Sequence, residues 1–420
     1  MDLVYKQIHH HGILIKIFYN IYMNYKIKYQ KGGFNYDSTS SSDSELDTLS
    51  SEKEYRTQQL KIPIIYFDFF VNTFNKTNNN TSLTNEPSNS IKPIVVDPKC
   101  IRTDADIYIA VNEWIDDPIT GTEKYCNISN WDTSRVTNMN ELFKGKVKFN
   151  EDISKWNVSN VTNMKEMFNL ALQFNQPLNS WNVSKVTDMV GMFASARAFN
   201  QPINLWNTSS VTKINAMFLL AASFDQPINT NVITRDDGTT YEAWDVSSVT
   251  IMNAMFQGAS SFNQPLDSWD VSNVIDMNNM FDQASTFNQT LDLWDVSKVT
   301  NMNGIFRNAF KFNNGENYGL SNKPLSWNVS KVIDMAKMFQ FARAFNQPIN
   351  TNIITRDDGT TYKAWDVSSV TDMSYMFNGA SSFEQDIKSW TVTVGTKKTN
   401  MFNGTELKKN PGLTLPGWYK

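Results

Sequence analysis

The chain has 420 residues, of which 40% are apolar and 13% aromatic, so it can build a sizeable hydrophobic core. Its 38 basic and 42 acidic side chains sum to a formal charge of −4, and this balance argues against a nucleic-acid partner. All three histidines lie at positions 9–11, which excludes histidine-dependent chemistry from the rest of the chain.

The first hundred residues show no clear targeting signal. The apolar run in residues 1–36 is interrupted by Lys16 and lacks a small-residue cleavage site, so the sequence does not determine the structure of this segment. The run YFDFFVNTF at 66–74 is too short to cross a bilayer, and we predict no transmembrane segment. Serine-, asparagine- and acid-rich sequence predicts a largely disordered linker over 37–99. Localisation remains unknown, with a cell or particle surface left open.

A tryptophan-based repeat occupies the rest of the chain. Trp131, Trp156, Trp181 and Trp206 are 25 residues apart, and six more tryptophans follow with the same flanking sequence. Each of the ten is followed 12 residues later by phenylalanine. This register predicts a repeat array over 131–404, followed by a tail over 405–420.

Each repeat unit has two halves. The pattern Leu/Ile-x-x-Trp-x-Val-Ser-x-Val predicts a short strand with alternate side chains inward, similar to the opening of a leucine-rich repeat. The following apolar positions, as at Met189, Met192, Phe193 and Ala196, have the spacing of a short helix with Thr187 as its N-cap. We therefore predict an α/β fold: a leucine-rich-repeat-like solenoid of about ten turns, each with one short parallel strand and one short helix.

Three insertions interrupt the array. The segments TNVITRDDGTTYEAW (230–244) and TNIITRDDGTTYKAW (351–365) lie 121 residues apart and indicate a duplicated block. Alternating polarity around Asp-Gly predicts that both are hairpins projecting from the same corner. A calcium loop is disfavoured there because further ligands are missing. The glycine-rich segment at 313–327 is predicted to be a loop.

The repeat W(N/D)VSxVTxMxxMFxxAxxFNQPL resembles that of the BspA-type bacterial surface protein family, which belongs to the leucine-rich-repeat superfamily and is also found in large DNA viruses. The resemblance covers about residues 101–404. It implies an adhesion or protein-interaction role without a catalytic residue. It also implies that 100–130 caps the array, with a helix before the first strand and with glycine expected where Cys126 stands. Cys100 and Cys126, the only cysteines, could be free or bridged.

The residue after each tryptophan should point outward, and it is Asn or Asp in nine of the ten repeats. Two interpretations stay open for this column: an Asx ladder that bonds neighbouring turns, which we favour, or a binding stripe for a basic protein segment or divalent ions. The candidate binding residues of this column and of the hairpins are Asp245, Asp270, Asp295, Asn328, Asp366, Arg235 and Arg356.

The sequence favours a non-catalytic scaffold that binds a protein partner through the repeat face and the hairpins. We expect no enzyme activity, cofactor or bound metal, and the sequence determines neither the partner nor the oligomeric state. The alternative is a glycan-active enzyme that uses paired aspartates on the strand face.

Overall fold

The computed structural model describes residues 96–419. The predictions for residues 1–36, including the targeting signal, lie outside the described residues, as do those for all but the last four residues of the predicted linker.

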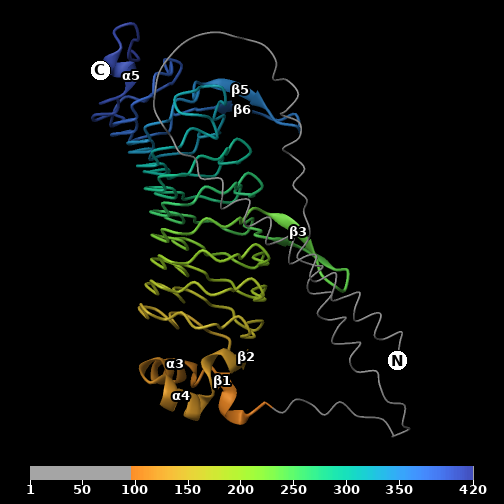
Figure 1. Cartoon of the computed structure of the whole chain (residues 1–420). Coiled ribbons are helices and arrows are strands. Elements are labelled where there is room, and N and C mark those ends of the chain that lie inside the picture. The colour runs from red at the N-terminus through yellow and green to blue at the C-terminus, as the bar shows by residue number, and fades with distance from the viewer. Residues whose placement is uncertain (1–95, 420) are drawn as a thin grey trace, which may run out of the picture. The chain divides into compact units, whose positions relative to one another are not determined.

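The N-terminal end of the array is a small cap (Figure 1). Helix α3 (Ile107–Asp116) buries Ile107, Ala110, Val111 and Trp114, which share one face because they are three or four residues apart. The cap consists of η1 (Pro98–Cys100), β1 (Ile101–Thr103), α3 (Ile107–Asp116), α4 (Pro118–Tyr125) and η2 (Ile128–Asn130), and β1 pairs in parallel with β2 (Asp132–Arg135).

A disulfide between Cys100 and Cys126 joins the two ends of the cap. The backbone of Cys126 has a φ of 66°, in the left-handed region that favours glycine. The glycine-like turn expected at this position is therefore formed by a cysteine, which the disulfide ties to the start of β1.

Successive repeats stack through backbone hydrogen bonds. Along one part of each repeat, the amides donate alternately to the next repeat and to their own repeat. The amides of Glu166 and Phe168 donate to Val190 and Met192 of the next turn, at 2.7 and 2.8 Å. The intervening amide of Met167 donates within its own turn, to a carbonyl three residues back. Every second amide therefore connects neighbouring turns.

The predicted helix of each repeat is wrong. An α-helix would use its amides internally, whereas the run from Met189 to Ala196 donates alternate amides to the next repeat and forms a series of tight turns. In this run, two residues of each repeat have a positive φ, which interrupts a right-handed helix. In the repeat that begins at Trp181 they are Gly191 (58°) and Ser195 (58°).

The predicted strand around each tryptophan is also absent, except for β2 next to Trp131. Parallel bridges lie instead at the seventh residue after each tryptophan. They connect Asn138, Asn163, Asp188 and Lys213 in one series, and Ile251, Asp276, Asn301, Asp334, Asp372 and Lys397 in another.

The interior consists of continuous aromatic columns. Phe168 stacks on Phe193 of the next turn at a centroid distance of 5.5 Å, and lies 4.0 Å from Phe174 of its own turn. The ten repeat tryptophans are at most 3% exposed and form a third column. The indole Nε1–H of Trp269 donates to the carbonyl oxygen of Ile228 at 2.8 Å, and the same bond recurs along the column. Each indole thus contributes both packing and a hydrogen bond between turns.

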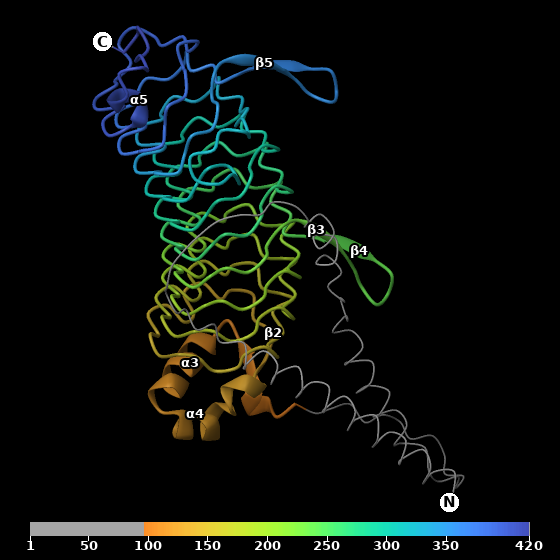
Figure 2. The ribbon, with the colours of Figure 1, turned by 45° about the horizontal axis from the view of Figure 1, so that its top comes forward.

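The two duplicated insertions form antiparallel hairpins on the same side of the stack (Figures 1 and 2). Stacking continues beneath the first one, because Trp206 and Trp244 are 6.4 Å apart although the insertion separates them in sequence. The strands are β3 (Asn231–Thr234), β4 (Thr240–Ala243), β5 (Asn352–Thr355) and β6 (Thr361–Ala364).

The C-terminal end packs on the last turn. After α5 (Glu406–Lys409), Trp418 stacks on Trp390 at 6.2 Å and continues the tryptophan column. Tyr419 contacts Phe402 edge-on at 4.8 Å. None of the helices between residues 96 and 419 is long and apolar enough to cross a membrane.

Candidate binding site at the hairpins

The Asn and Asp side chains after each tryptophan bond their own turn. The carboxylates of Asp245, Asp270 and Asp295 accept the backbone N–H two residues later at 2.9, 3.0 and 3.0 Å. Asn328 and Asp366 do the same at 3.3 and 3.2 Å. These are Asx turns, so the interpretation of this column as a ladder between neighbouring turns is wrong.

A ladder between turns exists at another position, the asparagine of the Asn-Gln-Pro corner. The side-chain oxygen of Asn175 accepts the backbone N–H of Asn200 at 2.9 Å, and that of Asn200 accepts from Asp225 at 2.9 Å. The sequence placed these residues at a turn but did not show that they bond the following turn. Their hydrogen bonds satisfy a backbone donor that the corner would otherwise leave free.

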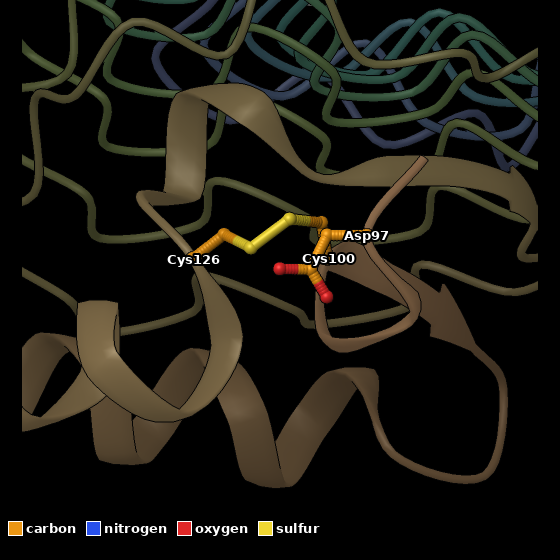
Figure 3. A group of neighbouring side chains, drawn as sticks. All are labelled: Asp97, Cys100 and Cys126. Atoms are coloured by element: carbon orange, nitrogen blue, oxygen red, sulfur yellow. A yellow bond between two sulfur atoms is a disulfide. The ribbon is translucent and has the colours of Figure 1, made fainter. Parts of the chain in front are cut away.

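The carboxylates of the column do not gather around a common point. Among the described residues, the His, Cys, Asp and Glu groups that lie close enough to share a metal ion are Asp97, Cys100 and Cys126 (Figure 3). The two sulfurs of that group are bonded to each other, so neither is a thiolate that could ligate metal. The divalent-ion interpretation of the stripe therefore gains no support from the geometry.

Each hairpin is held against the stack by a tyrosine. The hydroxyl of Tyr241 donates to the carbonyl of Leu205, and that of Tyr362 donates to Ser326, both at 2.6 Å. Burial raises the pKa of both tyrosines. The sequence pattern did not predict this role, although a tyrosine stands at the same place in both insertions.

The candidate arginines lie over these tyrosine rings. The guanidinium carbon of Arg235 is 4.3 Å from the ring centroid of Tyr241, and that of Arg356 is 4.8 Å from that of Tyr362. Such a stack orients the planar guanidinium and leaves its edge N–H groups free to bond. Both hairpins therefore present an arginine in the same local arrangement, stacked on a tyrosine whose hydroxyl bonds the array. This arrangement is called the hairpin frame.

The hairpin tips are closed by their own aspartates. The carboxylate of Asp237 accepts the backbone N–H and the hydroxyl of Thr239 at 2.9 and 2.6 Å. These bonds lower the pKa of Asp237. Gly238 has a φ of 82°, which completes the turn. Asp358, with its pKa also lowered, makes the same bonds to Thr360.

The surroundings of the two arginines differ. At the second hairpin, Arg356 Nη2 lies 3.2 Å from Asp295 Oδ1, so the structure brings two predicted site residues together. At the first hairpin the equivalent position is Asn182, which is neutral. In the part of the chain that the structure describes, Arg235 makes no ion pair with a carboxylate.

A second charge difference lies in the returning strands. Lys363 of β6 is 3.8 Å from the carboxylate of Asp366. The first hairpin has Glu242 at the equivalent place, three residues before Asp245. The second hairpin is therefore attached by two ion pairs, whereas within residues 96–419 neither Glu242 nor Arg235 of the first hairpin forms one.

A groove of about 660 Å³ opens between the first hairpin and the stack. Arg235 and Tyr241 form its hairpin wall, and Asn182 and Leu205 lie on the stack side. The remaining lining residues are Asn179, Ser180, Trp181, Val183, Asn207, Asp236 and Asp237. The groove thus combines one guanidinium, two carboxylates, several amides, a tyrosine and an exposed leucine.

This stacked array with two projecting hairpins defines a repeat protein. The chain belongs to the family described as "Mycoplasma protein of unknown function, DUF285", whose model matches residues 119–231, 233–350 and 316–412. No curated protein and no solved structure matches the chain.

Proposed function

We propose that this chain is a non-catalytic scaffold that binds a protein partner along its hairpin-bearing side. The observation that carries this proposal is the pair of hairpins, which leave the stack on the same side (Figure 2). Val232 of β3 and Ile353 of β5 occupy equivalent positions and are 65% and 67% exposed. Exposed apolar side chains on projecting elements favour a protein contact.

A surface or adhesion role is supported by two further observations. The repeat resembles that of BspA-type bacterial surface proteins, which is also found in large DNA viruses. The Cys100–Cys126 disulfide favours an oxidising compartment, because cytosolic thiols are usually kept reduced. Together they favour a protein that works outside a reducing cytosol.

Glycan hydrolysis is the less favoured alternative. That reaction needs two carboxyl groups that flank one glycosidic bond. The carboxylates of Asp245 and Asp270 each accept a hydrogen bond from their own turn, and neither lines the groove at the first hairpin.

Site-specific photo-crosslinking of the full chain tests the proposal. A benzoylphenylalanine replaces Val232 or Ile353, and the protein is irradiated with extracts and intact surfaces of its source cells. We expect discrete adducts with one protein from both positions. The matched control replaces Leu170, which is 45% exposed but lies in the turn run of a repeat, and should give none.

Equal adducts from Leu170 and the hairpins, or no adducts from the hairpins, would overturn the binding proposal. Release of reducing ends from a polysaccharide panel, lost in Asp245→Asn or Asp270→Asn, would establish the enzyme alternative instead.

A further inference from the structure

The second hairpin contains an internal example of what its arginine can bind. Asp295 Oδ1 accepts the backbone N–H of Ser297 at 3.0 Å and also lies 3.2 Å from Arg356 Nη2. A carboxylate can therefore reach a guanidinium that is stacked on the hairpin tyrosine. The side chains of Arg356 and Asp295 are both 38% exposed, so the contact sits at the surface of the stack.

The first hairpin keeps this frame but lacks the carboxylate. Arg235 stacks on Tyr241, whose hydroxyl bonds the stack as in the second hairpin. Asn182 replaces the aspartate, and its side-chain oxygen accepts from the backbone of Ser184 at 3.2 Å. An amide supplies no negative charge, so the guanidinium faces the groove without its ionic partner.

From this difference we propose that the groove beneath the first hairpin binds a carboxylate side chain of a protein partner, with Arg235 as its ligand. The proposal rests on the binding function proposed above and names the chemistry of one contact. The guanidinium offers two parallel N–H donors to a carboxylate. Leu205, which is 40% exposed in the groove, favours an apolar residue next to the acidic one.

Among residues 96–419, Arg235 forms no ion pair with the aspartates of its own hairpin tip. Its Nη1 donates to the hydroxyl of Thr239 at 3.3 Å, and Thr239 in turn donates to Asp237. These bonds from Thr239 are the main cause of the lowered pKa of Asp237, and the charge of Arg235 adds to it. The second hairpin carries the same Asp-Asp pair at its tip, yet its arginine pairs with Asp295 of the stack. The carboxylate that suits this frame therefore comes from the stack side of the groove.

The same aspartates favour a peptide over a polyanion. Asp236 and Asp237 both line the groove, so a chain of sulfate or phosphate groups would bring further negative charges against them. A single Asp or Glu within an otherwise neutral segment places one charge on Arg235, and it meets less of this repulsion than a chain of anionic groups does.

The test uses the full chain and two peptides, acetyl-Gly-Glu-Leu-Gly-amide and its Gln analogue. Saturation-transfer difference NMR of the peptide leucine methyl groups detects weak binding. We expect the signal to fall about threefold with the Gln peptide and with Arg235→Gln, since one exposed ion pair has a modest effect. Asn182→Asp, which supplies an internal carboxylate, should reduce it equally.

Two variants of the second hairpin provide the matched control. Arg356→Gln should leave the signal unchanged, because this guanidinium is already paired with Asp295. Asp295→Asn should increase it by freeing a second site, even when Arg235 is replaced by Gln. Thermal melts followed by circular dichroism confirm that each variant is folded.

Equal binding of the Glu and Gln peptides, or equal losses in Arg235→Gln and Arg356→Gln, would overturn the proposal. Heparin that displaces the peptide through Arg235 at lower concentration would assign the groove to a polyanion and also overturn it. If hairpin crosslinks form while the peptide results fail, only the chemistry of this contact is wrong. Absence of the crosslinks would instead refute the binding function itself.

Discussion

The two hairpins share nearly the same sequence and the same attachment, but the charges around them differ. In both, a tyrosine hydroxyl bonds a stack carbonyl at 2.6 Å and an arginine lies over the ring. Ion pairs attach the second hairpin through Asp295 and Lys363, whereas the first has Asn182 and Glu242 at these places.

For the arginine, this comparison shows that the hairpin geometry and the charge of the facing residue have separate origins. The bonds that shape each hairpin are made by residues of the insertion itself, which the two copies have in common. The partner of the arginine lies in the preceding turn, whose sequence differs between the copies. The stack therefore supplies an ionic partner to the arginine of the second insertion and a neutral amide at the equivalent place of the first.

The largest expected effect tests whether the core beneath the two hairpins is equivalent. Trp244 and Trp365 are 0% and 1% exposed, and each donates its indole N–H to a carbonyl of the preceding turn. Replacement of either by Ala should cost about 3 to 5 kcal/mol of unfolding free energy through the cavity that it leaves. Urea unfolding followed by circular dichroism measures both. Losses of unfolding free energy that differ by more than about 2 kcal/mol would show that the core beneath the two hairpins is not equivalent.

The tyrosine attachments should each contribute less, and they depend on pH. Tyr241→Phe or Tyr362→Phe should cost about 1 kcal/mol, because one hydrogen bond is lost. Burial raises both tyrosine pKa values, so their contribution is complete below the unfolded pKa of about 10 and is lost as the pH rises through the folded pKa.

The nearby charges should distinguish the two tyrosines. Besides burial, Asp295 raises the pKa of Tyr362 and Arg356 lowers it, whereas no carboxylate raises that of Tyr241. Asp295→Asn should therefore lower the pKa of Tyr362 and leave Tyr241 unchanged, as followed by NMR titration of the tyrosine Cζ signals. An unmoved Tyr362 would contradict the geometry of the pair.

The smallest expected effect comes from exchanging the charge difference itself. Asp295→Asn should weaken the second hairpin by about 0.5 kcal/mol, and Asn182→Asp should strengthen the first by a similar amount, because exposed ion pairs are weak. Hydrogen exchange of the amides of Arg235 and Arg356, which bond across each tip, reports the local opening. Both effects should shrink at high salt, and effects that persist unchanged would exclude an ionic origin.

The repeat, its inward residues and the two hairpins could be read from the sequence. A 25-residue period places the same side chain at the same point of every turn, so the burial of the Trp and Phe columns followed from spacing alone. The hairpins followed from local alternation around Asp237-Gly238 and Asp358-Gly359, because such turns depend on neighbours in the chain.

The backbone of each turn depended on contacts between turns. The spacing of Met189, Met192, Phe193 and Ala196 fits a helix and a stack of tight turns equally well. Only the amide bonds to the neighbouring turn favour the second, with positive φ at residues such as Ser195 that are not glycine. Local sequence does not contain the partner of those amides.

For the candidate site, too, the sequence identified the residues and the tertiary structure decided which of them meet. Sequence identified Asp295 and Arg356 as separate candidates, but it could not show that they meet, since 61 positions separate them along the chain. It also could not show that Arg235 stands opposite a neutral Asn182. Their meeting depends on which turn lies beneath each hairpin, and stacking alone decides this, because it brings together residues that are distant in the chain.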